Sequence, residues 1–166
     1  NQLMSELDIA LSSMERQILQ RMDQLQSRPA LFEAIKQLGE NGGGFLSANS
    51  AHPYENPTLL TNLVSTWAML IIPAATIDAF GRFVGNRRQS NRLLALVFGL
   101  LLIGVTVAMA AEQAGNPLLT SWLSGGNLQG KELRFGAPLT GFWSVVTTGT
   151  MTGAVNGLID AAMPLT

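Results

Sequence analysis

Cysteine is absent from this chain of 166 residues, and His52 is its only histidine. A structural zinc site needs several thiolate or imidazole ligands, so a metal centre of that kind is excluded. Because Pro53 follows His52 directly in a polar stretch, we expect the imidazole to pack or to form a hydrogen bond rather than to bind an ion.

Motifs for nucleotide and covalent chemistry are also missing. Glycines 42–44 lack the Gly-Lys-Ser/Thr ending of a phosphate-binding loop, so nucleotide binding has no support. No arrangement of a nucleophile with a base stands out along the chain. We therefore expect a protein that is not an enzyme on its own and that has no nucleic-acid partner.

Charge is scarce and unevenly placed. Only 13% of residues are charged, whereas 47% are hydrophobic. Residues 58–77 and 93–111 form uncharged runs of 20 and 19 residues, and each run can cross a hydrocarbon core of about 30 Å. The alternative is a pair of core helices in a soluble protein, but length and hydropathy favour two transmembrane helices.

A basic stretch at residues 82–92 separates the two uncharged runs. It holds four arginines and no acidic residue. A short basic loop between two spans belongs on the cytoplasmic side, which places the far end of each helix on the outer face. Asp78 and Arg82 are four residues apart at the inner end of the first helix, so they can form a surface ion pair.

A glycine-rich loop, NGGGFLSANSAHPYENP at residues 41–57, precedes the first uncharged run. Irregular backbone at membrane depth is tolerated only where it is buried in protein or lines a watery cavity. Residues 30–38 are apolar on one face and end at Gly39, which predicts a short helix leading into this loop. The pattern indicates a path for an ion or substrate that is lined by backbone.

A third uncharged stretch, residues 135–159, contains five glycines and five threonines. Glycine allows backbone conformations with positive φ, and threonine hydroxyls can bond to stranded backbone groups. We interpret residues 138–149 as a second short helix and residues 151–154 as an extended segment after it. Spacing alone favours a different interpretation, in which Gly149, Gly153 and Gly157 form a helix-packing face.

The glycine-rich loop resembles a selectivity-filter loop of the potassium-translocating A subunit (KdpA) of the bacterial Kdp potassium-transporting P-type ATPase. The family sequence is NGGGFFNANSAHPFENPT, and positions 41–58 agree with it except at Leu46, Ser47 and Tyr54. Further landmarks follow in the family's order over roughly residues 30–166: Arg87-Arg88-Gln89, Gly115-Asn116-Pro117, Gly130-Lys131-Glu132, Val146-Thr147-Thr148 and Val155-Asn156.

The resemblance implies an all-α membrane protein built from potassium-channel-like repeats of helix, pore loop and helix. This chain would hold two spanning helices and two re-entrant pore loops, whereas the family's subunit is similar to four such repeats in one chain. The expected segments are a pore helix and first filter at 30–58, two spanning helices at 59–111, an outer loop at 112–137, and a second pore helix, filter and start of a helix at 138–166.

Backbone carbonyls of a potassium filter replace the water shell of the ion. By resemblance, K⁺ would contact Asn41, Gly42 and Gly43 in the first unit and Thr152, Gly153 and Ala154 in the second. The chain departs from the family in two places: at Glu40, where the family has threonine, and at Met151 with Thr152, where it has smaller or amide residues. Glu40 could raise the local cation concentration, although we favour a solvated acid of the outer loop.

Residues 1–29 lie outside the resemblance. Apolar side chains recur there at spacings of three and four residues among charged ones, which predicts a soluble amphipathic helix that ends near Pro29. This stretch lacks the apolar core of a signal peptide. Three alternatives stay open: a helix that binds a partner, a helix that self-associates, and a divergent outer segment of the family.

Two functions of different class follow. In the first, the chain belongs to a K⁺-transporting complex of the bacterial inner membrane, surrounded by lipid and driven by a separate ATP-hydrolysing subunit. Self-association could then supply four filter strands from two copies. In the second, it is a truncated or remnant membrane interaction module that keeps the fold without transporting.

Overall fold

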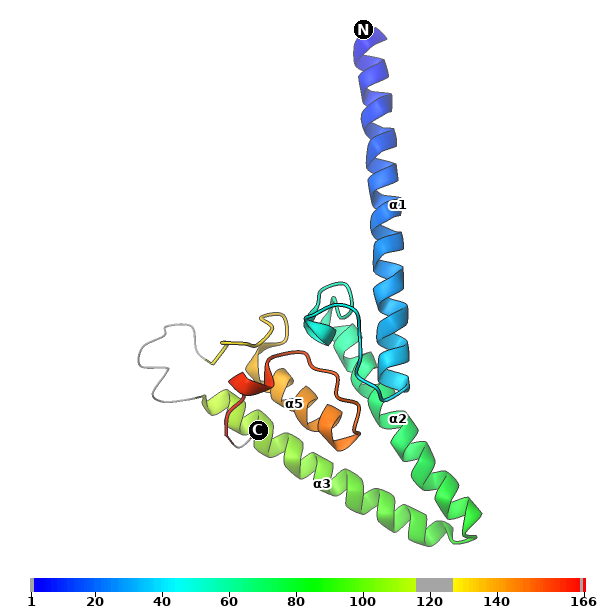
Figure 1. Ribbon diagram of the computed structural model, residues 1–166, viewed down its shortest axis with the longest axis vertical. Coiled ribbons are helices and arrows are strands. Elements are labelled where there is room, and N and C mark those ends of the chain that lie inside the picture. Colours follow the sequence, from blue (N-terminus) through cyan, green and yellow to red (C-terminus); the bar gives the residue numbers. More distant parts are fainter. Residues whose placement is uncertain (1, 116–126, 165) are drawn as a thin grey trace.

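The computed structural model describes residues 2–115, 127–164 and 166, without the side chains of residues 2–11, 18–19 and 22–27 (Figure 1). Within that part, the helices are α1 (Gln2–Leu38), α2 (Leu59–Phe83), α3 (Arg87–Ala114) and α5 (Gly136–Gly149). Two 3-10 turns are η1 (Asn49–Ala51) and η2 (Ile159–Ala161). The described residues contain no strand, so the expected all-α class is confirmed. Part of the expected outer loop, including Asn116 and Pro117, lies outside the described residues.

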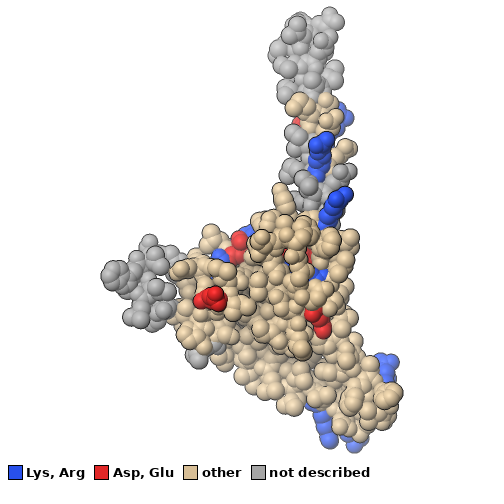
Figure 2. Space-filling model, viewed as in Figure 1, with Lys and Arg blue, Asp and Glu red and all other residues tan. Residues whose placement is uncertain are grey.

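The helices α2 and α3 form a hairpin, and α5 lies in the angle between them (Figure 1). Both arms of the hairpin are long and apolar enough to cross a membrane. Lys and Arg atoms gather at the closed end of the hairpin, where α2 turns into α3 (Figure 2). The predicted basic turn is therefore at the opposite end of these helices from the glycine-rich loop.

Small residues let the two arms meet closely at the turn. A methyl group added to Gly81 would lie 2.7 Å from Ser90 Oγ, and that hydroxyl donates a hydrogen bond to the Ile77 carbonyl at 2.7 Å. Asp78 and Arg82 form the predicted pair, with 2.8 Å between Oδ2 and Nε. Both side chains of this pair are exposed, so we expect it to contribute little to stability.

The α1 helix runs without a break through Pro29, so the predicted helix end at Pro29 is wrong, as is the separate short helix at 30–38. A proline inside a helix removes one backbone hydrogen bond and disfavours the helix locally. The following turns nevertheless pack against α2, and Glu33, Lys36 and Gln37 are buried there. Tertiary contacts thus override the local cost of the proline.

The second short helix is close to its prediction, since α5 begins at Gly136 and ends at Gly149. Gly153 and Gly157 lie beyond that end in irregular backbone, so the helix-packing face made of Gly149, Gly153 and Gly157 is wrong. A small apolar core joins α5 to both arms of the hairpin: Met69, Val105, Trp143, Val146 and Ala154. Because Ala154 belongs to this core, the core positions the segment that follows α5.

Candidate functional site

The two segments predicted as filters meet backbone to backbone. Gly42 is buried, and a methyl group at its α carbon would lie 2.5 Å from the Gly153 carbonyl carbon and 2.6 Å from the Ala154 nitrogen. Such a short distance is impossible for a real side chain, so only glycine fits there. The structure therefore brings together Asn41–Gly43 and Thr152–Ala154, which are far apart in the sequence.

The two segments also leave their helices in the same way. After α1, the Gly39 amide donates to the Ile35 carbonyl at 2.8 Å; after α5, the Thr150 amide donates to the Val146 carbonyl at 3.0 Å. The next pair of hydrogen bonds matches too. The Asn41 amide donates to the Lys36 carbonyl at 3.4 Å, and the Thr152 amide donates to the Thr147 carbonyl at 2.9 Å. Each helix end thus reverses the chain at a corresponding position.

Positive φ angles recur at alternate residues of both segments. The values are 49° at Glu40 and 61° at Gly42, then 63° at Met151 and 78° at Gly153. A left-handed conformation costs a residue with a side chain roughly 1–2 kcal/mol, so Glu40 and Met151 are strained. Strain at matching places in two segments is typical of a functional constraint on the backbone.

Two of the six predicted carbonyls accept a hydrogen bond from a described side chain. Gly42 accepts a hydrogen bond from Asn49 Nδ2 at 3.0 Å, and Ala154 accepts one from Trp143 Nε1 at 2.9 Å. No described residue donates a hydrogen bond to the carbonyl oxygens of the remaining four residues: Asn41, Gly43, Thr152 and Gly153. The engaged carbonyls anchor the segments, and the other four are candidate ligands.

Glu40 differs from its expectation as a solvated acid. Its Oε1 atom is buried and has no hydrogen-bond partner among the described residues. This residue directly precedes the first segment in the sequence. His52 behaves as expected, because its Nδ1 accepts a hydrogen bond from the Tyr54 amide at 3.2 Å.

Side chains to which the sequence analysis assigned no structural role hold the regions around the two segments together. Arg134, just before α5, donates to the carbonyls of Asn56 at 2.6 Å and Ala51 at 2.5 Å in the loop after the first segment. Asn62 Oδ1 of α2 accepts from Asn56 at 2.9 Å and from Asn156 at 3.1 Å. Apart from the bond between Asn56 and Asn62, these bonds link residues remote in the sequence, which spacing along the chain cannot reveal.

A buried ion pair fixes the chain after the second segment. Glu112, at the end of α3, lies 3.0 Å from Lys131 Nζ and accepts the Met163 amide at 2.8 Å. Lys131 also donates to the Ala161 carbonyl at 2.8 Å. The expected outer loop is thus tied to α3 and to η2.

A second buried group of charges lies behind the first segment. Lys36 Nζ is 2.5 Å from Glu33 and 2.6 Å from Glu55, and all three side chains are at least nine-tenths buried. The sequence analysis missed this group because charged residues in a helix and a polar loop are usually solvated. The only available signal was their position beside an apolar helix face.

The sequence also matches a known protein family. The model of the family described as potassium-transporting ATPase A subunit (KdpA) matches residues 9–166, including residues 9–29, where the sequence analysis found no resemblance.

Three similar proteins, each named potassium-transporting ATPase potassium-binding subunit, come from Nostoc sp., Paracidovorax citrulli and Mycobacterium tuberculosis. They are 54%, 45% and 51% identical to the chain over 137, 168 and 142 residues, respectively.

These alignments cover 81%, 95% and 80% of this chain but only 24%, 28% and 25% of the relatives. The chain thus spans about a quarter of the length of the curated relatives it matches. The family model, in contrast, matches nearly the whole chain. The chain therefore belongs to the KdpA family of potassium-transporting ATPase A subunits.

Proposed function

We propose that the chain forms part of a K⁺ path in a Kdp-type transporter, with Asn41–Gly43 and Thr152–Ala154 as two of the strands that line it. The observation that carries this proposal is the direct contact of Gly42 with the backbone of residues 152–154, beside four carbonyls that accept no hydrogen bond from any described residue. We take the ion to be K⁺ because the relatives are named potassium-binding subunits.

A cation in such a path must exchange its water shell for oxygen ligands. Carbonyls provide them without a fixed charge that would hold the ion too tightly. The positive φ angles at Gly42 and Gly153 turn the backbone locally, and glycine adopts them at no steric cost. The chain's contribution is coordination of K⁺, and it performs no catalytic step.

The environment that this function requires is the bacterial inner membrane, crossed more than once. The two arms of the hairpin would contact lipid and neighbouring pore segments, and a separate subunit would hydrolyse ATP. Two filter strands do not surround an axis, so further segments are needed to close the path. These come from the rest of a longer subunit or from a second copy of the chain.

Purification from native membranes tests this assignment. A tagged copy, extracted in mild detergent, should be recovered with an ATP-hydrolysing subunit and further pore segments, and the complex should hydrolyse ATP faster when K⁺ is added. Recovery as a monomer, with no stabilisation by K⁺ over Na⁺ in a thermal melt, would instead support the interaction module that keeps the fold without transporting.

A further inference from the structure

A cluster of three buried charges lies directly behind the first filter segment. Lys36 of α1 contacts Glu33 on the same helix and Glu55 in the loop that follows the segment. The side chains of Glu33, Lys36 and Glu55 are 6%, 1% and 0% exposed. Two carboxyl groups thus share one lysine amino group in a part of the protein with little solvent exposure.

The cluster closes the loop that carries the filter residues. Lys36 and Glu55 are joined across the whole of that loop, and Gln37 of α1 donates to Ser50 in its middle at 3.0 Å. The neighbouring Asn49 donates to the Gly42 carbonyl at 3.0 Å. A chain of contacts therefore runs from the buried charges to the filter backbone.

Gly44 brings the cluster even closer to the filter. A methyl group added there would lie 3.1 Å from Glu55 Oε1 and 3.6 Å from Lys36 Nζ. The backbone oxygen of Lys36 also accepts the Asn41 amide at 3.4 Å. The backbone of Lys36 thus bonds to Asn41, the first residue of the filter segment. Its side chain lies near Gly44, which follows the last residue of that segment.

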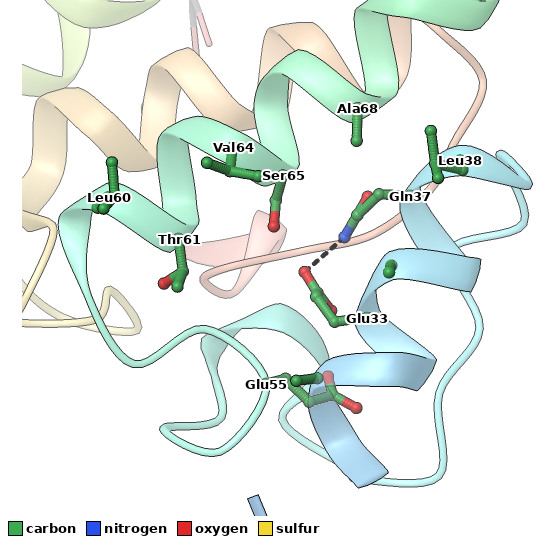
Figure 3. Close-up of a pocket in the computed structure, with 11 residues that line it drawn as sticks. Glu33, Gln37, Leu38, Glu55, Leu60, Thr61, Val64, Ser65 and Ala68 are labelled. Atoms are coloured by element: carbon green, nitrogen blue, oxygen red, sulfur yellow. Dashed lines mark hydrogen bonds between the residues drawn. The ribbon is translucent and has the colours of Figure 1, made fainter. Parts of the chain in front are cut away.

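The far side of the cluster faces a cavity of about 350 Å³ between α1 and α2. Figure 3 shows Glu33 and Gln37 extending from α1 into this space toward α2. The oxygens Gln37 Oε1 and Glu55 Oε1 are buried without a hydrogen-bond partner among the described residues. Because the cavity leaves room to rotate, the carboxylates would move away from the filter if Lys36 were lost.

Among the described residues, the second unit has no such cluster directly behind its segment. The positions that correspond to Lys36 and Glu55 are Thr147 and Thr166, neither of which is charged. The second segment is instead anchored in the apolar core, where Trp143 bonds to the Ala154 carbonyl. The cluster of Glu33, Lys36 and Glu55 thus serves the first segment, whereas the buried pair of Glu112 and Lys131 holds the chain that follows the second.

We propose that Lys36 and Glu55 are positioning residues for the first filter segment: their ion pair holds the loop onto α1 and keeps the carbonyls of Asn41 and Gly43 aimed at the ion. This inference rests on the proposed function. Breaking a buried pair by removing one partner leaves an uncompensated charge, so single substitutions should be costly. The expected consequence is a less selective filter.

Amide hydrogen exchange, measured in lipid nanodiscs without K⁺, tests the positioning directly. Lys36→Met and Glu55→Gln should each raise exchange in residues 41–56 by about tenfold, the effect of a small loss of local stability. The exposed pair supplies the control, because Arg82→Gln should leave the same amides unchanged. Unchanged exchange in both cluster variants would overturn the proposal, whether or not the protein binds K⁺.

Uptake by the assembled transporter separates positioning from general damage. The cluster variants should lower the ratio of K⁺ to Na⁺ uptake by about tenfold, whereas a merely structural role would reduce both ions in proportion. The double variant Lys36→Met/Glu55→Gln keeps the net charge of the cluster but removes the contact, so selectivity should stay lost. Restored selectivity in the double variant would show that the charge acts by itself and would overturn the positioning role.

Discussion

Neighbouring glycines of the first predicted filter segment are under different structural constraints. Gly42 has a φ of 61° and no space for a side chain, whereas Gly43 has neither constraint, because the nearest atom to an added methyl group is 3.9 Å away. Three consecutive glycines in the sequence signal unusual backbone. They do not say which glycine is pressed against the second segment, because that contact comes from a distant part of the chain.

Replacing Gly42 with alanine should destabilise the protein, because the methyl group overlaps the backbone of residues 153–154. We expect a loss of about 1–3 kcal/mol in the free energy of unfolding, as for other overpacked sites. Thermal melting in detergent measures it, with Gly43→Ala as the matched control that should change little. Equal melting temperatures for the two variants would contradict the observed contact.

The indole of Trp143 anchors the second segment through its bond to the Ala154 carbonyl. Trp143→Phe removes the donor and leaves that buried carbonyl unpaired, so stability should fall by about 1–3 kcal/mol. The same change frees a carbonyl in the filter segment, and we expect K⁺ to stabilise the variant less selectively over Na⁺. Melting curves in each salt measure both effects, and curves that match the unsubstituted protein would refute the anchor.

Residue types in the sequence predict local backbone conformation well, but they do not predict contacts between distant elements. The sequence predicts the irregular backbone at 41–43 and 152–154 and the ion pair of Asp78 with Arg82, since these depend on local pattern. It does not predict the pair of Lys36 with Glu55 or the role of Arg134. Their partners lie on other elements, and charged residues are usually solvated.

Among the elements, α1 shows most clearly how packing overrides local preference. Pro29 is a strong signal for the end of a helix, yet α1 continues to Leu38, where its last turns pack against α2. The predictions for α2 and α3 succeed because these helices coincide with long uncharged runs. The prediction for α5 succeeds because the sequence becomes rich in glycine where this helix ends. Helix length in α1 is instead decided by burial of its final two turns.

Arg134 joins the start of α5 to the loop between α1 and α2. Arg134→Gln removes the charged donors to the Ala51 and Asn56 carbonyls, each of which is worth about 1.5–3 kcal/mol. We expect a clear drop in melting temperature and faster amide exchange in residues 51–56. Arg82→Gln is the control, since its partner lies on its own helix; if the two variants lost equal stability, the bridge would have no structural role.

The two ends of the hairpin formed by α2 and α3 differ in charge. Basic residues gather at the turn between α2 and α3, and the glycine-rich loop lies beyond the opposite ends of those helices (Figures 1 and 2). Cytoplasmic loops carry an excess of arginine and lysine, so the turn should face the cytoplasm and the glycine-rich loop the outside.

Single introduced cysteines can test this orientation, because the chain has none of its own. Ser47→Cys, in the exposed glycine-rich loop, should react with an impermeant thiol reagent in intact cells. Arg88→Cys, in the exposed turn, should react only after the membrane is opened. The reverse pattern would contradict the orientation, and labelling of both sites in intact cells would contradict a membrane-spanning hairpin.

If the segments at 41–43 and 152–154 line one cation path, substitutions in either segment should impair Rb⁺ uptake by the assembled transporter. Measuring that uptake is the most direct test of the path. Gly43→Asp and Gly153→Asp place a charge in that path, and both side chains have open space. Aspartate is among the residues that tolerate positive φ best, so the fold should survive at Gly153. Gly85→Asp is the matched control, since Gly85 has a φ of 72° and open space at the distant turn.

We predict that each filter variant loses selective Rb⁺ uptake while Gly85→Asp retains it, because a side chain enters a path built for bare carbonyls. Selective uptake at the unsubstituted rate in both filter variants would contradict the account, because neither segment could then line the path.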